Sequence, residues 1–203
     1  SAYPEFDKIY KKLSKKLKVS SKNIVFTAGS DQAIKNTFEL FYKRNTEVIT
    51  IDPTFAMVDV YCKIFKTKQI KIAHDKNLQL RFKDIYRAIN KNTSLIILAN
   101  PNSPTGTVIT KNDLIKIIKK ARRYGAKVLL DEAYHEFSTY NFLSKIKNFD
   151  NLIIIRTFSK IFGLAGLRAG YVLSNENIIK KYFAIKPMYE INSIAVKALE
   201  LIL

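Results

Sequence analysis

Residues 152–173 read LIIIRTFSKIFGLAGLRAGYVL, and this stretch decides the class of fold. Two apolar runs, 152–156 and 169–173, are separated by a glycine-containing segment that carries Lys160 and Arg168. Runs that are apolar on both faces are typical of strands buried inside a mostly parallel sheet. The pattern therefore predicts two buried strands and, between them, a segment with two cations eight residues apart.

The same pattern recurs through the whole chain. Further strands are predicted at 23–27, 47–51, 94–99 and 127–131. Segments of helical period lie between the strands and predict helices at 5–18, 31–43, 56–66, 82–90, 111–124 and 176–186. This alternation predicts an α/β fold, a three-layer αβα sandwich with a mostly parallel sheet. Residues 1–203 are expected to form one domain.

Composition narrows the class of protein. A chain of 203 residues that is 47% hydrophobic can bury one sizeable core. No apolar run approaches the roughly 20 residues of a membrane-spanning helix, and the single Cys62 fits a reducing, cytoplasmic location. One cysteine and two scattered histidines give no metal-ligand spacing, so no metal is expected.

The net charge of +18 raises the possibility of a nucleic-acid partner. The lysines, however, are interleaved with apolar positions on helices such as 111–124, which is typical of solvated helix faces. No nucleic-acid-binding motif is present, so neither a nucleic-acid nor a membrane partner is expected. A nucleic-acid binder would show an affinity that falls steeply with salt.

Chemically useful residues follow five of the predicted strands. In open α/β sheets, ligands bind where the strands deliver their carboxyl ends to loops. The loops in question contain Gly29-Ser30-Asp31, Asp52-Pro53-Thr54-Phe55, the segment 100–106, Asp131-Glu132-Ala133-Tyr134 and Thr157-Phe158-Ser159-Lys160. They would bring hydroxyls, amides, a carboxylate, a phenol and an amine to one rim of the sheet.

Four motifs in this order resemble a known family: TAGSDQAI (27–34), ANPNSPTG (99–106), DEAYHEF (131–137) and RTFSKIFGLAGLRAGY (156–171). The chain resembles the fold-type-I pyridoxal-phosphate aminotransferases of class I/II, in particular the histidinol-phosphate aminotransferases, over essentially its whole length. The resemblance implies transfer of an amino group from a small-molecule donor, such as histidinol phosphate or an amino acid, to a 2-oxo acid such as 2-oxoglutarate. It also implies a homodimer with a shared active site and a cytoplasmic role in histidine biosynthesis.

The resemblance assigns catalytic roles to three residues. Lys160 matches the lysine that forms a Schiff base with the cofactor and later moves the substrate proton; the alternative is a surface lysine at the start of a helix. Apolar neighbours and the nearby Arg168 are expected to lower its pKa. Asp131 ends a buried strand as a lone carboxylate, which needs a partner such as the protonated pyridine nitrogen; the alternative is a residue that only caps the following turn. Tyr134 matches the tyrosine that hydrogen-bonds the ring O3′; the alternative is a buried structural tyrosine.

Further residues are assigned to the cofactor. The backbone N–H groups of Ser30 and Asp31 open a helix and are candidates for its phosphate, together with Ser159 and Arg168. An ordinary helix cap is the other interpretation of Ser30 and Asp31. Phe55 matches an aromatic ring that lies against the pyridine face, or else is a core residue. Tyr3 matches a tyrosine that reaches the cofactor phosphate of the neighbouring subunit, or is simply exposed at a terminus.

One position departs from the family. Many relatives have Asn immediately before PTG to contact O3′, and here that residue is Ser103. Either Asn100 or Asn102 takes over, with Asn100 favoured because it leaves the strand end directly, or Ser103 makes a shorter contact. The peptide bonds 100–101 and 103–104 are candidates for the cis form. Glu132, His135, Glu136 and Cys62 are interpreted as structural.

Two other functions stay open. An amino-acid-phosphate decarboxylase would share all these motifs. A catalytically incomplete cofactor-binding domain is the second, because the family's N-terminal segment and small C-terminal domain are expected to lie outside residues 1–203. On that expectation, the chain binds cofactor yet transaminates poorly.

Overall fold

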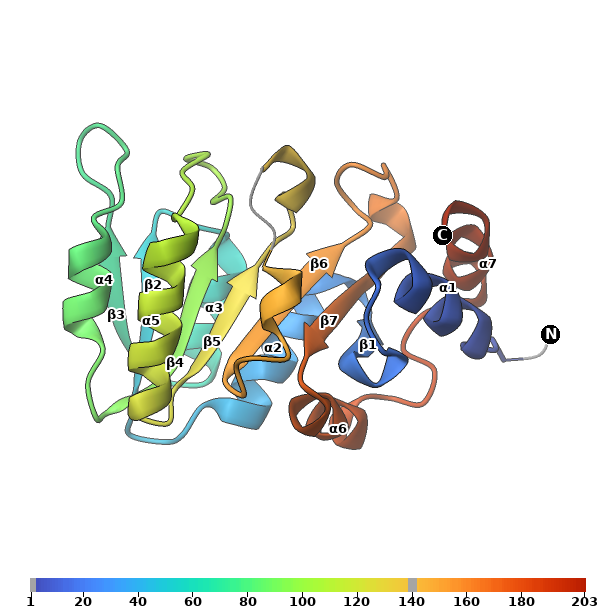
Figure 1. Cartoon of the computed structure of the whole chain (residues 1–203), viewed down its shortest axis with the longest axis horizontal. Helices are drawn as coiled ribbons and strands as arrows, with labels where there is room; N and C mark the ends of the chain where they lie inside the picture. Colours follow the sequence, from blue (N-terminus) through green and yellow to red (C-terminus); the bar gives the residue numbers. More distant parts are fainter. Residues whose placement is uncertain (1–2, 139–141) are drawn as a thin grey trace.

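A computed structural model describes residues 3–138 and 142–203 of the chain. Its centre is a seven-stranded sheet in the order β1-β7-β6-β5-β4-β2-β3 (Figure 1). The strands are β1 (Ile24–Thr27), β2 (Glu47–Asp52), β3 (Lys68–Ala73), β4 (Thr93–Ala99), β5 (Lys127–Asp131), β6 (Leu152–Thr157) and β7 (Gly170–Ser174).

Strand direction decides which loops meet. Strands β3, β2, β4, β5 and β6 pair in parallel, whereas β7 is antiparallel to both of its neighbours, β6 and β1. Strand β1 therefore points the same way as β6, and β7 alone is reversed. As a result, the start of β7 lies at the same rim as the ends of the other six strands.

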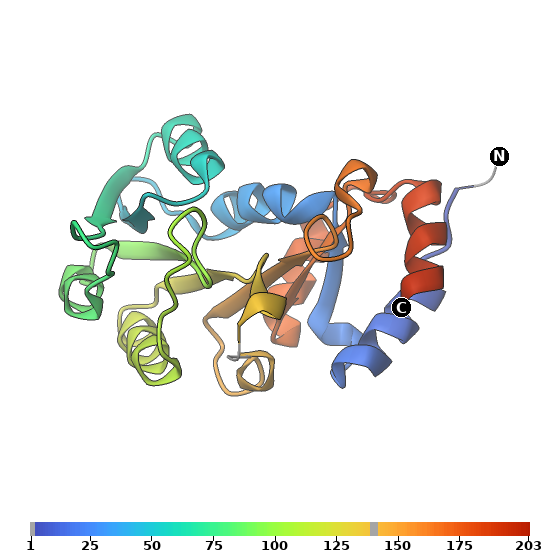
Figure 2. The same cartoon turned by 90° about the horizontal axis from the view of Figure 1, so that it is seen from above.

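Helices cover both faces of the sheet. They are α1 (Asp7–Leu17), α2 (Gly29–Phe41), α3 (Ala56–Ile64), α4 (Phe82–Ala88), α5 (Lys111–Arg123), α6 (Glu176–Ile185) and α7 (Ser193–Ile202). Buried residues of α2, α3 and α6 form one apolar cluster with the sheet, and those of α1, α4, α5 and α7 form the other. Figure 2 shows α2 and α3 on one side of the sheet and α4 and α5 on the other. The predicted three-layer αβα sandwich is confirmed.

The central strands are apolar on both faces because both faces are covered. Every residue of β4 and β6 is buried. The edge strand β3, in contrast, contains only exposed and half-buried residues. Its sequence KQIKIA lacks the continuous apolar run used to predict strands, so the pattern does not predict it.

The predicted helices agree with the structure to within two or three residues at each end, and α7 is an additional helix. Helix α2 begins at Gly29, two residues before the predicted start. Helix α7 packs on α1, where Lys8 forms an ion pair with Glu200 at 3.3 Å. Within residues 3–138 and 142–203, no helix is both long and apolar enough to span a membrane.

Candidate active site

A cavity of about 260 Å³ opens at the rim where the strand ends meet. It is lined by Ser30, Asp31, Phe55, Ala99, Pro101, Ser103, Asp131, Ala133, Tyr134, Thr157, Ser159, Lys160, Ala165 and Arg168. These residues come from the ends of β1, β2, β4, β5 and β6 and from the segment that leads into β7. The structure thus brings together all five loops that the sequence predicted to converge.

The first turn of α2 forms one wall of the cavity. Gly29 has φ of +82°, a conformation that glycine adopts without the steric cost of a side chain. The next two residues, Ser30 and Asp31, both line the cavity. Because the first N–H groups of a helix have no partner inside the helix, this turn is suited to binding an anion.

Strand β7 packs closely against this turn. A Cβ atom added to Gly170 would lie 2.7 Å from the carbonyl carbon of Gly29 and 2.7 Å from the nitrogen of Ser30. Only a residue without a side chain permits so close an approach. Gly170 therefore allows the N-terminus of α2 to pack directly against β7.

Arg168 reaches the same place because β7 is reversed. It lies two residues before the strand, and its guanidinium packs against Gly29, with Nη2 only 3.0 Å from the position of a Cβ on that glycine. Ser159 also lines the cavity and is held by Thr157. The backbone N–H of Ser159 donates to Thr157 Oγ1 at 3.1 Å, and that hydroxyl donates to Ser159 Oγ at 2.9 Å.

Asp131 is the carboxylate of the cavity. It is the last residue of β5 and only 8% exposed. The backbone N–H of Ala133 donates to its Oδ1 at 2.9 Å. Burial raises the pKa of Asp131 to about 6, against the lowering effect of that hydrogen bond and of the Lys160 charge. A cation placed beside this carboxylate would offset the cost of burying its charge.

Tyr134 and Lys160 lie side by side. The Lys160 Nζ is 5.0 Å from the centre of the Tyr134 ring. Hydrogen bonding with Lys160 lowers the pKa of the Tyr134 hydroxyl, and a hydrogen bond with Ser103 lowers it further, both against the effect of burial. The amine, the phenol and the Ser103 hydroxyl thus form one connected group.

The surroundings of Lys160 differ from the prediction. The sequence suggested an apolar, buried setting, but Lys160 is exposed and the following Ile161 is 50% exposed. The residues of 161–167 are themselves exposed or half-buried, so their apolar side chains do not bury the amine. Lys160 nevertheless lines the cavity.

The two asparagines of the segment 100–106 form hydrogen bonds with neighbouring segments of the chain. Asn100 Oδ1 accepts from the Ile109 backbone N–H at 2.8 Å. Asn102 donates to the Pro53 carbonyl at 2.9 Å and accepts from the Thr54 hydroxyl at 2.8 Å. Neither lines the cavity, whereas Ser103 does. Of the three alternatives, Ser103 is the residue that lines the cavity, and the contact to O3′ stays a prediction. The peptide bonds 100–101 and 103–104 are cis, as expected.

Phe55 and Tyr3 have different placements. Phe55 lines the cavity and is 42% exposed, so it is not a core residue. Tyr3 is 73% exposed and stacks on Tyr189, with ring centres 4.1 Å apart, outside the cavity lining. Asp31 also accepts a hydrogen bond from the Tyr61 hydroxyl at 3.1 Å.

Sequence reasoning placed Thr157 at the rim of the sheet but assigned it no role in the site. It lines the cavity and orients Ser159, and its signal was its position at the end of a buried strand two residues before that serine. No group of residues suited to a metal ion is found in the part of the chain that the structure describes.

Comparison with known proteins identifies the family. The family model "Aminotransferase class I and II" matches residues 2–202. The chain belongs to this family. Its members are enzymes, so the predicted resemblance is confirmed, and membership of the family supports the predicted cofactor, pyridoxal phosphate.

Individual relatives agree with the family model. The histidinol-phosphate aminotransferase of Caldanaerobacter subterraneus subsp. tengcongensis is 37% identical over 193 residues, which cover 95% of this chain and 54% of that protein. The enzyme of the same name from Buchnera aphidicola subsp. Cinara cedri is 41% identical over 182 residues, covering 88% of this chain and 51% of that protein. The chain thus spans about half the length of the curated relatives it matches.

Solved structures share the fold. The histidinol-phosphate aminotransferase from Clostridium acetobutylicum has a TM-score of 0.88 and 28% identity, covering 98% of this chain and 60% of that one. The L-threonine-O-3-phosphate decarboxylase from Porphyromonas gingivalis has a TM-score of 0.85 at 24% identity, covering 99% of this chain and 63% of that one. The second likeness concerns the fold alone.

Proposed function

We propose that the chain binds pyridoxal phosphate covalently through Lys160. We further propose that the protein transfers an amino group between a donor, such as histidinol phosphate or an amino acid, and a 2-oxo acid such as 2-oxoglutarate. The observation that carries this proposal is the cavity lined together by the Lys160 amine, the Asp131 carboxylate, the Tyr134 phenol and the first turn of α2.

The residues present fit this cofactor. A phosphate group suits the N-terminal turn of α2, with the Arg168 guanidinium and the Ser159 hydroxyl as further donors. A protonated pyridine nitrogen suits Asp131, because it supplies the positive partner that a buried carboxylate lacks. Phe55 offers an aromatic face at the mouth of the cavity.

The bound cofactor supplies an electron sink for the bond that breaks at the substrate's α-carbon. The chain's own residues handle protons and orientation. Asp131 holds a proton on the ring nitrogen, where its negative charge favours the protonated form. The Lys160 Nζ, once free of the cofactor, takes the proton from the α-carbon and returns it. Tyr134 keeps Lys160 in place through their hydrogen bond.

The names of the relatives support histidinol phosphate as the donor. An amino-acid-phosphate decarboxylase remains the second candidate, since it would share the same sequence motifs. We also propose a homodimer in which Tyr3 contacts the cofactor phosphate of the neighbouring subunit; its exposed ring, outside its own cavity, supports this interpretation. Sedimentation equilibrium would test the dimer, and a monomer at micromolar concentration would contradict it.

Borohydride reduction of the cofactor-loaded chain, followed by peptide mapping, tests the attachment. The pyridoxyl group is expected on Lys160, and label on any other lysine would contradict the assignment. Because Lys160 is exposed, Lys160→Ala should leave the free energy of unfolding within about 0.5 kcal/mol of the parent. The same variant should lose the visible absorption of the bound cofactor.

The substrate is tested separately. The chain is incubated with histidinol phosphate and 2-oxoglutarate, and glutamate formation is measured; phosphoserine and phosphothreonine are assayed for carbon dioxide. Glutamate supports the aminotransferase, whereas carbon dioxide without a keto product supports the decarboxylase. Cofactor attachment with neither product supports a cofactor-binding domain.

A further inference from the structure

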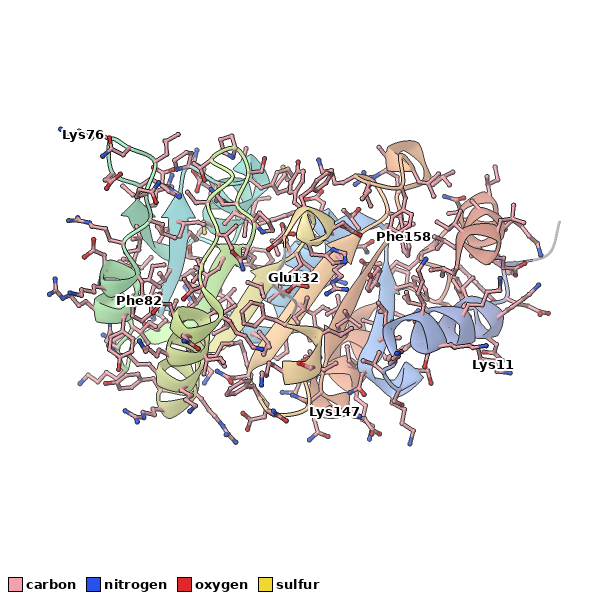
Figure 3. All side chains as sticks on the ribbon, turned by 45° about the horizontal axis from the view of Figure 1, so that its top comes forward. Lys11, Lys76, Phe82, Glu132, Lys147 and Phe158 are labelled. Carbon is pink, nitrogen blue, oxygen red and sulfur yellow. The ribbon has the colours of Figure 1, made fainter. Side chains whose placement is uncertain are left out.

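A buried ion pair, Glu132 with Arg156, adjoins two residues that line the cavity, Asp131 and Thr157. Arg156 Nε and Nη2 donate to Glu132 Oε2 at 2.9 and 2.7 Å. Glu132 is 1% exposed and Arg156 is 2% exposed. Figure 3 places Glu132 over the middle of the sheet, in the interior of the molecule. Neither residue lines the cavity, and neither has a part in the proposed function.

Arg156 connects three neighbouring strands. It belongs to β6, and its partner Glu132 directly follows the last residue of β5. In the antiparallel register it lies opposite Tyr171 of β7, with whose hydroxyl it forms a hydrogen bond. The backbone adds a further link, since the Glu132 N–H donates to the Ile155 carbonyl at 2.9 Å. The ends of β5 and β6 and the start of β7 are thus joined through one guanidinium.

Each of these three strands has a residue of the candidate site close to it in the sequence. Asp131 immediately precedes Glu132, Lys160 follows Arg156 by four residues, and Arg168 precedes Tyr171 by three residues. The guanidinium is a rigid fork with fixed donor directions, so it fixes the relative positions of the residues that accept from it. A displacement of one strand end would break this arrangement.

Stability alone does not account for the pair. Removing two charges from water costs several kcal/mol per ion, and apolar residues of similar volume are often as stable or more stable at such sites. The surrounding strands offer apolar neighbours throughout, for example Ile154 and Ile155. The pair is better explained by the geometry that it imposes than by the free energy it contributes.

We propose that Glu132 and Arg156 are positioning residues that hold Asp131 and Lys160 at the separation which the cofactor requires. This inference rests on the proposed binding of pyridoxal phosphate at the cavity.

The pair also acts on Asp131 through charge. The negative charge of Glu132 raises the pKa of Asp131, and the Lys160 charge lowers it. Arg156 partly neutralises Glu132. On the far side of the pair, burial and then the charge of Arg156 lower the pKa of His135 to about 4, so this histidine is neutral at pH 7. Burial raises the pKa of Glu136, which lies beside it.

The test separates positioning from stability with a double variant, Glu132→Leu with Arg156→Met. Cofactor-free chains are unfolded in urea, and pyridoxal phosphate is then titrated into the folded chains and followed by its visible absorption. The expected result is an unfolding midpoint at or above that of the parent, together with cofactor binding at least about tenfold weaker. Parental affinity in a folded double variant would overturn the proposal.

A milder variant covers the case in which the double variant does not fold. Glu132→Gln keeps an oxygen acceptor for Arg156 and removes the charge next to Asp131. The pH at which the visible band of the bound cofactor changes should then move away from the parental value. Parental affinity together with a parental pH profile in Glu132→Gln would also overturn the proposal.

The control is Glu47→Gln. Glu47 is 7% exposed and accepts from Lys68 at 2.8 Å, but it lies at the opposite end of the sheet, where β2 begins. This variant should lower the unfolding midpoint and leave the visible band unchanged. If the parent chain binds no cofactor at all, the proposed function fails first, and the two failures are thereby distinguished.

Discussion

Asp131→Asn is expected to stabilise the cofactor-free chain. The side chain is 8% exposed, and burial raises its pKa from 3.8 to about 6. A carboxyl whose pKa is raised on folding contributes most stability when protonated, below pH 3.8. That stability is lost as the pH rises towards 6, because the unfolded chain ionises more readily than the folded one. The stability lost through ionisation of Asp131 amounts to about 3 kcal/mol above pH 7 and about half of that at pH 5.

Asparagine removes this penalty with little change of shape. Its Oδ1 can still accept the hydrogen bond that Ala133 donates at 2.9 Å. Urea unfolding followed by circular dichroism at pH 5 and pH 8 measures the effect. Asp131→Asn should unfold at higher urea than the parent at both values, with a larger difference at pH 8. A variant that is less stable than the parent, or a difference that does not depend on pH, would refute this reasoning.

Bound cofactor should reduce the stability advantage of Asp131→Asn over the parent. With pyridoxal phosphate bound, the carboxylate of Asp131 gains a cationic partner and the neutral amide of the variant does not, so the cofactor should stabilise the parent more than the variant. The variant is expected to retain cofactor, but in the full-length protein its transamination rate should fall about a thousandfold, because an amide does not hold the ring nitrogen protonated. A near-parental rate would show that Asp131 is only structural.

Two further changes test the packing around the site. Gly170→Ala places a methyl group 2.7 Å from the backbone of the α2 N-terminus. It should lower the free energy of unfolding in urea by about 1–3 kcal/mol and weaken cofactor binding. The control is Gly166→Ala, which has open space around it and should do neither. Burial raises the pKa of Glu190 to about 7, so the folded chain resists ionisation of this carboxyl. Glu190→Gln should therefore stabilise the chain by about 1.5 kcal/mol at pH 8 and much less at pH 4.5. Solvent screening of the half-buried side chain keeps this effect below what the pKa shift alone would give. A pH-independent effect would contradict the second prediction.

Much of the site could be predicted because its residues lie next to strand ends in the sequence. Asp131 and Lys160 each follow a continuous apolar run, and runs of that kind end at the same rim of a parallel sheet. Ser103 could not be chosen over Asn100 in the same way. Both asparagines and the serine of segment 99–106 are compatible with a contact to the cofactor, and only the hydrogen bonds to Ile109 and Pro53 show that the asparagines are already used.

The sequence by itself determined the alternation of strands and helices, the covered sheet and the set of residues at its rim, because apolar periodicity is a local property of the chain. Only the tertiary structure decided the reversal of β7, which brings the residue before the strand, Arg168, to the α2 N-terminus. It also decided the exposure of Lys160 and the pairing of Glu132 with Arg156. These features depend on contacts between segments far apart in the chain, and the local pattern of residues carries no information about them.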